Sequence, residues 1–363
     1  MGETEKYIPS FTNITSWQAL LRYNTGGSRS KYVALNPENN IEYFFKGSKE
    51  TNDGEIRYPT EFWSEIVSSK VGKLLGFDIL DYNIAYNSEH LQKVGCISKS
   101  MIIHSENTLT EGITYLIGFN PLYRPKLRDH QKKYTFEFIS EALNYFDLSK
   151  YIENIIEHII FDSIIGNSDR HQENWAVITK YEKLFDQIEN PDNNKFFLRR
   201  IKNRFNKFIL KNLKHQISDK VNIPKRLNLK FQVEIAPNIF APIYDSGCCL
   251  GREVLENKIS GLLVSDDAIN NYIVKGKSEI HWNGKKQNHF ELIKLISEKH
   301  GLFVKTKIRN IKSNYNADLL KDLIFMIDEN LPPELSDFKL SDERKQLMNK
   351  LITLRIRKLF ELL

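Results

Sequence analysis

The sequence predicts an α+β fold of two lobes, a small β-rich lobe at residues 1–104 and a larger, mainly helical lobe at 105–363. Strand-like runs of alternating polarity and one helix fill the first third of the chain, whereas apolar residues in the remainder recur mostly at helical spacing. A hydrophobic fraction of 41% and a charged fraction of 27% are ordinary for a globular protein. The 363 residues suffice for a sizeable core.

The first lobe is built around one helix, predicted at about 61–75. Thr60 can cap its first turn, Glu61 suits its positive end, and Gly76 ends it. Apolar pairs recur every three to four residues along the helix and give it one apolar stripe. Strands are predicted at 21–35, interrupted by a Gly-Gly pair, at 41–47, with Lys46 at the exit, and as a pair within 91–103.

The second lobe is predicted to be mostly helical. The segment 149–166 carries isoleucines on one face, so the polar stretch that follows it begins at the end of a well-buried helix. His281 and His289 lie near Trp282 in a polar stretch, which favours a surface loop. Short strands are expected at 175–179 and 239–247, and helices near 289–299, 316–329 and 341–361.

The sequence predicts a cytoplasmic protein, with secretion as an effector left open. The first fifteen residues lack the apolar run of a signal peptide, and no stretch approaches the ~20 apolar residues of a transmembrane segment. Three cysteines make no disulfide framework, which favours a reducing compartment. No histidine at zinc spacing lies near Cys248 and Cys249, so both are expected to be small buried residues.

Positive charge is concentrated in one segment, residues 195–230. It contains twelve Lys or Arg and one acidic residue, a local charge of +11, whereas the whole chain carries +6. The remainder of the chain is therefore net negative. Two interpretations stay open: a solvated helical insertion, or a surface that attracts an acidic protein, an RNA-associated partner or an anionic membrane.

The most informative stretch is "GNSDRHQEN" at 166–174, between a predicted helix and a predicted strand. A carboxylate such as that of Asp169 can act as a general base, and an amide oxygen such as that of Asn174 can bind Mg²⁺. Read alone, the stretch is also compatible with a polar loop whose side chains cap backbone groups.

Four further features strengthen the catalytic interpretation. The turn Gly26-Gly27-Ser28 can bring backbone N–H groups close to phosphate, and Lys46, about twenty residues later, can neutralise phosphate charge. Glu65 lies on the following helix and can hold that lysine, and Asp245 ends an apolar strand. In this chain order the features match the parts of protein-kinase-type phosphoryl transfer, although a full GxGxxG, an HRD and a DFG are absent.

These motifs resemble those of the HipA-like kinases, including their stand-alone CtkA-like branch, which are distant relatives of phosphatidylinositol kinases. The family's catalytic loop reads GN-[ST]-DRH-x-x-N, and "GNSDRHQEN" is similar to it. Its metal-binding strand reads PI-[YF]-D-x-G-x-x-L, and "PIYDSGCCLGRE" at 242–253 matches it. The helix "EFWSEIVSSKVGKLLGF" at 61–77 resembles the family's glutamate-bearing helix. The resemblance implies a two-lobed, protein-kinase-like fold and an ATP- and Mg²⁺-dependent serine/threonine protein kinase.

The resemblance also implies a role for each matching residue. Asp169 would be the catalytic aspartate that orients and deprotonates the substrate hydroxyl. His171 would be a catalytic-loop residue that supports the loop by hydrogen bonding. Arg170 would contact phosphate or form a structural ion pair. Autophosphorylation is expected at Ser28 or Ser30. ATP would be bound by Gly26, Gly27, Ser28, Lys46 (which Glu65 would position) and the backbone near Met101 and Ile102, and Mg²⁺ by Asn174 and Asp245.

Two other functions stay open at this point, a lipid or small-molecule kinase and an inactive nucleotide-binding interaction module. HipA toxins carry an additional N-terminal subdomain, often involved in antitoxin contact. Here the glycine turn begins by residue 26, so that subdomain is expected to be absent or encoded separately, and an antitoxin partner is left open.

Overall fold

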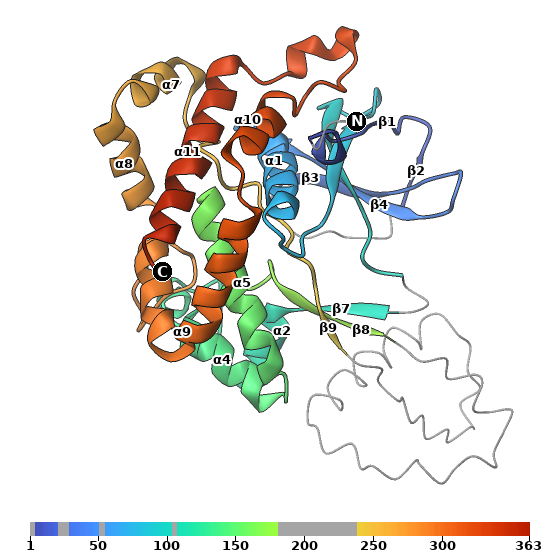
Figure 1. Cartoon of the computed structure of the whole chain (residues 1–363). Coiled ribbons are helices and arrows are strands. Elements are labelled where there is room, and N and C mark those ends of the chain that lie inside the picture. The colour runs from blue at the N-terminus through green and yellow to red at the C-terminus, as the bar shows by residue number, and fades with distance from the viewer. Residues whose placement is uncertain (1–3, 21–28, 51–54, 104–106, 181–237) are drawn as a thin grey trace, which may run out of the picture.

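A six-stranded sheet forms the first part of the computed structural model, which describes residues 4–20, 29–50, 55–103, 107–180 and 238–363 (Figure 1). The strand order is β1-β5-β6-β4-β3-β2. β1 and β5 pair in parallel, and all other neighbours in this sheet pair antiparallel. The strands are β1 (Phe11–Asn13), β2 (Gln18–Ala19), β3 (Arg29–Leu35), β4 (Glu42–Lys49), β5 (Tyr82–Tyr86) and β6 (Val94–Lys99).

One helix, α1 (Glu61–Leu74), packs against this sheet, within a residue of the predicted bounds. Gly76 adopts the left-handed conformation, and the N–H of Phe77 bonds to the carbonyl of Gly72, so the helix ends in a Schellman motif. Thr60 occupies the N-cap position, but its side chain accepts no capping hydrogen bond. Glu61 does not face solvent at the helix start either, because it is buried in an ion pair with Arg252.

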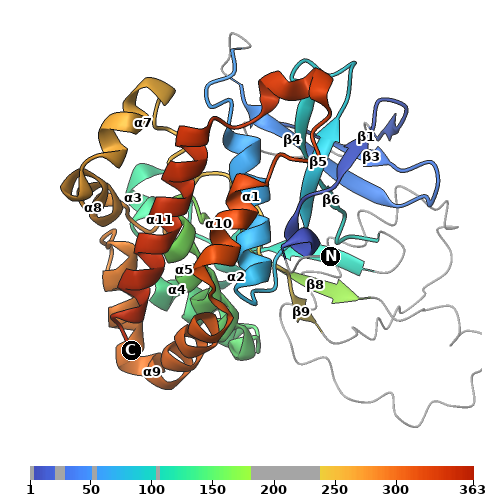
Figure 2. The same ribbon diagram turned by 45° about the horizontal axis from the view of Figure 1, so that its top comes forward.

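The single apolar stripe predicted for α1 is wrong, because thirteen of its fourteen residues are buried. Strands cover one side of the helix, and the C-terminal segment covers another, as Figure 2 shows for α10 (Ala317–Phe325). The indole N–H of Trp63 donates to the carbonyl oxygen of Phe338 at 2.8 Å. Small side chains such as Ser64 and Ser68 occupy the turns between the apolar pairs, where they are also buried. Both lobes thus enclose this helix.

A second, three-stranded antiparallel sheet, β7-β8-β9, lies beside the helical part. It places the start of β8 and the end of β9 next to each other, since Val177 pairs with Phe240. The segment between β8 and β9 includes the basic residues 195–230, which lie outside the described residues. The strands are β7 (Asn107–Glu111), β8 (Ala176–Lys180) and β9 (Ile239–Phe240).

The helical part is centred on α5 (Ile152–Ile165), which packs against α9 (His289–Asn314) and α11 (Asp342–Phe360). One continuous apolar core runs from Ile66 of α1 to Ile160 of α5 and on to the C-terminal helices. In the described ranges no helix combines the length and the apolar character that a transmembrane segment needs. The remaining helices are α2 (Gly112–Phe119), α3 (Arg128–Gln131), α4 (Phe136–Tyr145), α7 (Glu256–Leu263) and α8 (Asp266–Lys275), with 3₁₀ turns η1 (Glu5–Tyr7), η2 (Ser149–Tyr151) and η4 (Pro333–Phe338).

Several predicted elements differ from the structure. The predicted pair within 91–103 is one strand, β6, because Lys93 has a positive φ that ends a turn and the strand partner lies upstream in β5. The predicted strand 239–247 pairs with β8 only over its first two residues, since the chain then leaves β8 and forms an isolated parallel bridge between Ile243 and Ile79, just after α1. Lys46 lies within β4 and not at its exit. His281 and His289 are buried, not in a surface loop: the backbone of His281 bonds to Tyr134 and Phe136 ahead of α4, and His289 begins α9, which packs inward.

Candidate active site

The catalytic-loop stretch follows α5 directly and is organised by Asp162, in the last turn of that helix. Gly166 takes the left-handed conformation at the helix end, which a side chain would strain. The Asp162 carboxylate then accepts hydrogen bonds from Asn167 Nδ2 at 2.9 Å and from Arg170 Nε and Nη2 at 3.0 and 2.8 Å. A bidentate bond of this kind fixes both position and orientation, so the loop folds back onto its own helix.

Arg170 joins this loop to the segment after β9. Its Nη1 donates to the carbonyl oxygens of Asn174 at 3.0 Å and Tyr244 at 2.7 Å, and its Nη2 donates to Ser246 Oγ at 3.1 Å. Burial alone would lower the pKa of Arg170, but the carboxylate of Asp162 outweighs it and raises the pKa, so the guanidinium stays charged. With 1% of its surface exposed, Arg170 forms a structural ion pair.

Asp169 lies at the outer end of the loop and is partly exposed. Its backbone N–H donates to Asn167 Oδ1 at 3.2 Å, and its carbonyl oxygen accepts from Asn174 Nδ2 at 2.7 Å. Both backbone groups are thus held within the loop. The carboxylate oxygen Oδ2 lies 3.1 Å from the sulfur of Cys248.

Lys46 is surrounded by three polar groups from three different elements. Its Nζ lies 3.4 Å from Oε1 of Glu65 on α1, 3.3 Å from Oδ1 of Asp245 and 3.2 Å from the hydroxyl of Tyr82 on β5. The second carboxylate oxygen of Glu65 accepts the backbone N–H of Ser246 at 2.9 Å. Burial raises the pKa of Tyr82, so its hydroxyl stays neutral. A lysine held in this way presents a fixed positive charge.

The two candidate metal ligands come from the two segments that Arg170 joins. Asp245 has a positive φ of 55°, a conformation that Asp tolerates better than most residues. Because Nδ2 of Asn174 is used within the loop, its Oδ1 is left for another partner, and no described residue donates to it. Two protein oxygens fit Mg²⁺, which is usually bound by one or two side chains together with substrate phosphates and water.

The contacts of the other predicted site residues are local and assign them no specific role. The side chain of His171 is about one third exposed, and its Nδ1 accepts the backbone N–H of Glu173 at 3.3 Å, a contact within the loop. Met101 packs near Tyr244 beside the second sheet. The N–H of Ile102 donates to the Ser100 hydroxyl at 3.1 Å. Gly26, Gly27 and Ser28 lie outside the described residues.

Sequence reasoning missed three residues of this site, Asp162, Tyr82 and Cys248. Asp162 had a signal, since it is an acidic residue in an otherwise apolar part of a buried helix. Tyr82 had none, because any residue at that strand position can pack on the helix. Cys249 is buried as expected, but Cys248 is partly exposed and turns toward Asp169.

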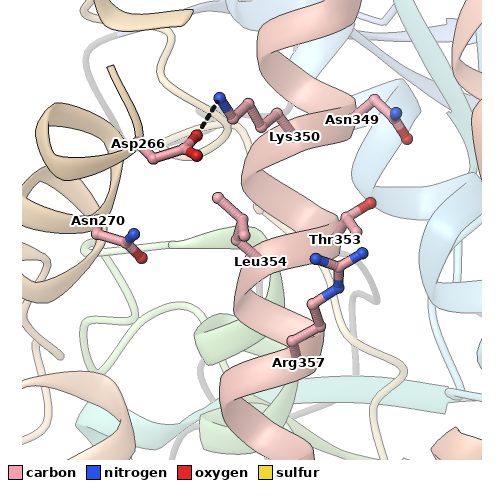
Figure 3. A pocket seen from close by; sticks show the side chains of 7 residues that line it. All are labelled: Asp266, Asn270, Asn349, Lys350, Thr353, Leu354 and Arg357. Carbon is pink, nitrogen blue, oxygen red and sulfur yellow. Dashed lines mark hydrogen bonds and ion pairs between the residues drawn. The ribbon is translucent and has the colours of Figure 1, made fainter. Parts of the chain in front are cut away.

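A surface hollow of about 450 Å³ lies elsewhere, between α8 and α11 (Figure 3). An ion pair of 2.8 Å between Asp266 and Lys350 spans the two helices there. None of the site residues described above lines this hollow, so the hollow is separate from the candidate active site. The hollow is lined by Asp266, Asn270, Asn349, Lys350, Thr353, Leu354 and Arg357.

Comparison with known proteins finds a likeness among solved structures. No family model and no curated protein matches the chain. Among solved structures, the chain is similar to the crystal structure of the Helicobacter pylori proinflammatory kinase CtkA, with a TM-score of 0.63 and 16% sequence identity. The match covers 98% of this chain and 96% of that chain. At this identity the likeness establishes the fold alone, and the predicted two-lobed, protein-kinase-like fold is confirmed.

Proposed function

We propose that this protein is an ATP- and Mg²⁺-dependent serine/threonine protein kinase of the HipA-like type. The observation that carries the proposal is the meeting of Lys46, Glu65 and Asp245, from β4, α1 and the segment after β9, within 3.4 Å of one ammonium nitrogen. Arg170 ties the same segment to the loop that bears Asp169. Residues far apart in sequence thus form one constellation of the kind that phosphoryl transfer uses.

In this proposal the residues of the chain act mainly by positioning and by charge. Asp169 orients the substrate hydroxyl and takes its proton while the oxygen attacks the γ-phosphorus of ATP and ADP leaves. Lys46 neutralises charge on the phosphates, and Glu65 keeps Lys46 in place. Asn174 and Asp245 would hold Mg²⁺, which when bound stabilises negative charge on the phosphate oxygens.

The substrate class and the setting are part of the same proposal. The motif resemblance to HipA-like kinases supports a protein hydroxyl as acceptor, and the similar structure, which is named a kinase, supports phosphoryl transfer in general. Autophosphorylation at Ser28 or Ser30 would modify the turn next to the phosphates, and added negative charge there would weaken ATP binding. A cytoplasmic location, where ATP is plentiful, is the setting that we propose.

The test is a transfer assay with γ-labelled ATP, in three arms: protein alone, protein with cell extract, and protein with phosphoinositide vesicles. We expect Mg²⁺-dependent label on serine or threonine of proteins, and none with Asp169→Asn. Asp322→Asn, an exposed change on α10, is the matched control and should keep full activity. Label in lipid alone would show a lipid kinase instead, and no label in any arm would favour the inactive module. Mass spectrometry of the first arm locates any autophosphorylated serine.

A further inference from the structure

We infer that Cys248 is a positioning residue for Asp169, which rests on the proposed function. The sulfur of Cys248 lies 3.1 Å from Oδ2 of Asp169 and 3.9 Å from Oε1 of Glu61. A thiol has one hydrogen to donate, and the nearer carboxylate is that of Asp169. Among the residues that the structure describes, no other group hydrogen-bonds to the Asp169 carboxylate.

The position of Cys248 is fixed on both sides of it in the chain. The backbone N–H of Ser246 donates to Glu65, and the thiol of Cys249 donates to the carbonyl oxygen of Ser246 at 2.9 Å. On the other side, the N–H of Leu250 donates to the carbonyl oxygen of Ile165 at 3.0 Å, at the end of α5. The thiol is therefore presented to the catalytic loop by a segment that is anchored to both α1 and α5.

This contact gives the two carboxylate oxygens of Asp169 different roles. A hydrogen bond to Oδ2 restricts rotation of the Asp169 side chain and leaves Oδ1 for the substrate hydroxyl. Without it, a partly exposed aspartate samples several rotamers, and only some of them point an oxygen at the hydroxyl. Reaction rates are sensitive to such orientation, because a misplaced catalytic group loses the advantage of proximity. Cys248 thus acts on the rate through Asp169 and need not touch ATP.

The test compares Cys248→Ala with Cys248→Ser, whose hydroxyl can still donate to a carboxylate. We expect the alanine variant to lower kcat about tenfold, the effect of one hydrogen bond to a charged group. The KM for ATP should stay within about twofold of wild type, since uniform binding is not affected. The serine variant should recover most of the lost rate. Thermal unfolding of both variants should match wild type.

Each result has a defined meaning. An unchanged kcat for the alanine variant, or an equal loss for serine and alanine, overturns the inference. A fall in kcat that comes with a lower Tm and a higher KM for ATP also overturns it, because that pattern reports a structural role. Asp169→Asn is measured in parallel: if it is inactive while Cys248→Ala is normal, only the role of Cys248 fails. If Asp169→Asn is active, the proposed function fails.

Discussion

The ammonium nitrogen of Lys46 lies 3.3 Å from Oδ1 of Asp245, a residue 199 positions further along the chain. The same nitrogen lies 3.4 Å from Glu65, so one positive charge is shared by two carboxylates. The lysine is 8% exposed, and its charge is therefore only weakly screened by water. This shared ion pair joins the two lobes at the point where we place the phosphates of ATP.

Replacing Lys46 with methionine should remove most of the transfer activity. Methionine has nearly the same length, so the change removes the charge and the hydrogen bonds while it fills the space. We expect kcat/KM for ATP to fall by a factor that corresponds to a loss of about 3–4 kcal/mol of transition-state stabilisation. Removal of other electrostatic contacts to a transition state has an effect of this size. Lys99→Met, on the exposed side of β6, is the control. A loss within about fivefold of the control, near 1 kcal/mol, would contradict the assignment.

The two buried glutamates of α1 should behave differently. Glu65→Gln keeps an oxygen that can accept from Ser246 but loses one of the two charges that hold Lys46, so kcat should fall about tenfold. The change in stability should be small, because Asp245 still pairs with Lys46. Glu61→Gln breaks the ion pair with Arg252 and should lower the free energy of unfolding by about 2–3 kcal/mol, below the range for fully buried pairs because Arg252 keeps some access to water. Steady-state kinetics and urea unfolding distinguish them. If the two effects were exchanged, Glu61 would be the residue that positions the lysine.

Mg²⁺ dependence should change when either proposed ligand is altered. Asp245→Asn and Asn174→Ala should raise the Mg²⁺ concentration for half-maximal activity by about tenfold or more, since even residues behind metal ligands affect affinity this strongly. The measurement is a metal titration at saturating ATP. Asp322→Asn should leave the titration unchanged. If all three variants gave the wild-type curve, the metal would have to be bound elsewhere.

Stability should fall as the solution becomes acidic, through two buried histidines. Burial lowers the pKa of His158 to about 3, with a contribution from Arg170, and burial lowers that of His289 to about 3, with a contribution from Arg355. The unfolded chain binds a proton on each below about pH 6.5, whereas the folded chain binds them only below a pKa of about 3. Between these two pH values, each histidine therefore removes up to about 1.4 kcal/mol of stability per pH unit as the pH falls.

Urea unfolding at pH 7, 6 and 5 measures this slope. His289→Leu should make the slope shallower by roughly one histidine's share, about 1.4 kcal/mol per pH unit between pH 6 and 5. Ile293→Val, one turn further along α9, is the control. It removes a buried methylene group and should lower the free energy of unfolding by the same amount at all three pH values, leaving the slope unchanged. Equal slopes for wild type and His289→Leu would mean that His289 is protonated in the folded protein.

The basic segment 195–230, which lies outside the described residues, should affect encounter with a substrate more than chemistry. Replacing Arg199, Arg200, Lys202 and Arg204 with glutamine should lower substrate phosphorylation at low salt and leave basal ATP turnover nearly unchanged. The difference should vanish as salt rises, because the Debye length falls from ~10 Å at 0.1 M to ~3 Å at 1 M. An equal loss of basal turnover would indicate a structural role instead.

The sequence was most informative where one interaction determines local structure. The bounds of α1 follow from apolar spacing and from Gly76, which needs a positive φ, and they were predicted within a residue. The length of the strand predicted at 239–247 was overestimated, because most of its apolar residues do not face a neighbouring strand. Phe240 packs on His158 of α5, and Ile243 pairs with Ile79 just after α1, and only tertiary structure decides such contacts.

The candidate site was predictable in its residue types but not in its geometry. The motifs indicate which carboxylates and amides belong together, and the structure brings Lys46, Glu65 and Asp245 into contact. The motifs could not reveal that Cys248 contacts Asp169. That contact depends on a short segment after β9 that is anchored at both ends, and nothing in the local pattern records it.

The burial of α1 has a consequence for how such an enzyme could be controlled. An outward movement of the helix would take Glu65 away from Lys46, but it would also expose apolar side chains from a core that both lobes share. At roughly 1.5–3 kcal/mol for each large apolar side chain exposed, uncovering three or four of those on α1 would cost more than the few kcal/mol by which a ligand shifts an equilibrium. Under the proposed function, Lys46 is thus already held in place before any substrate arrives. Control would then act on access to the site, as modification of the turn at Ser28 or Ser30 would, and not through rotation of this helix.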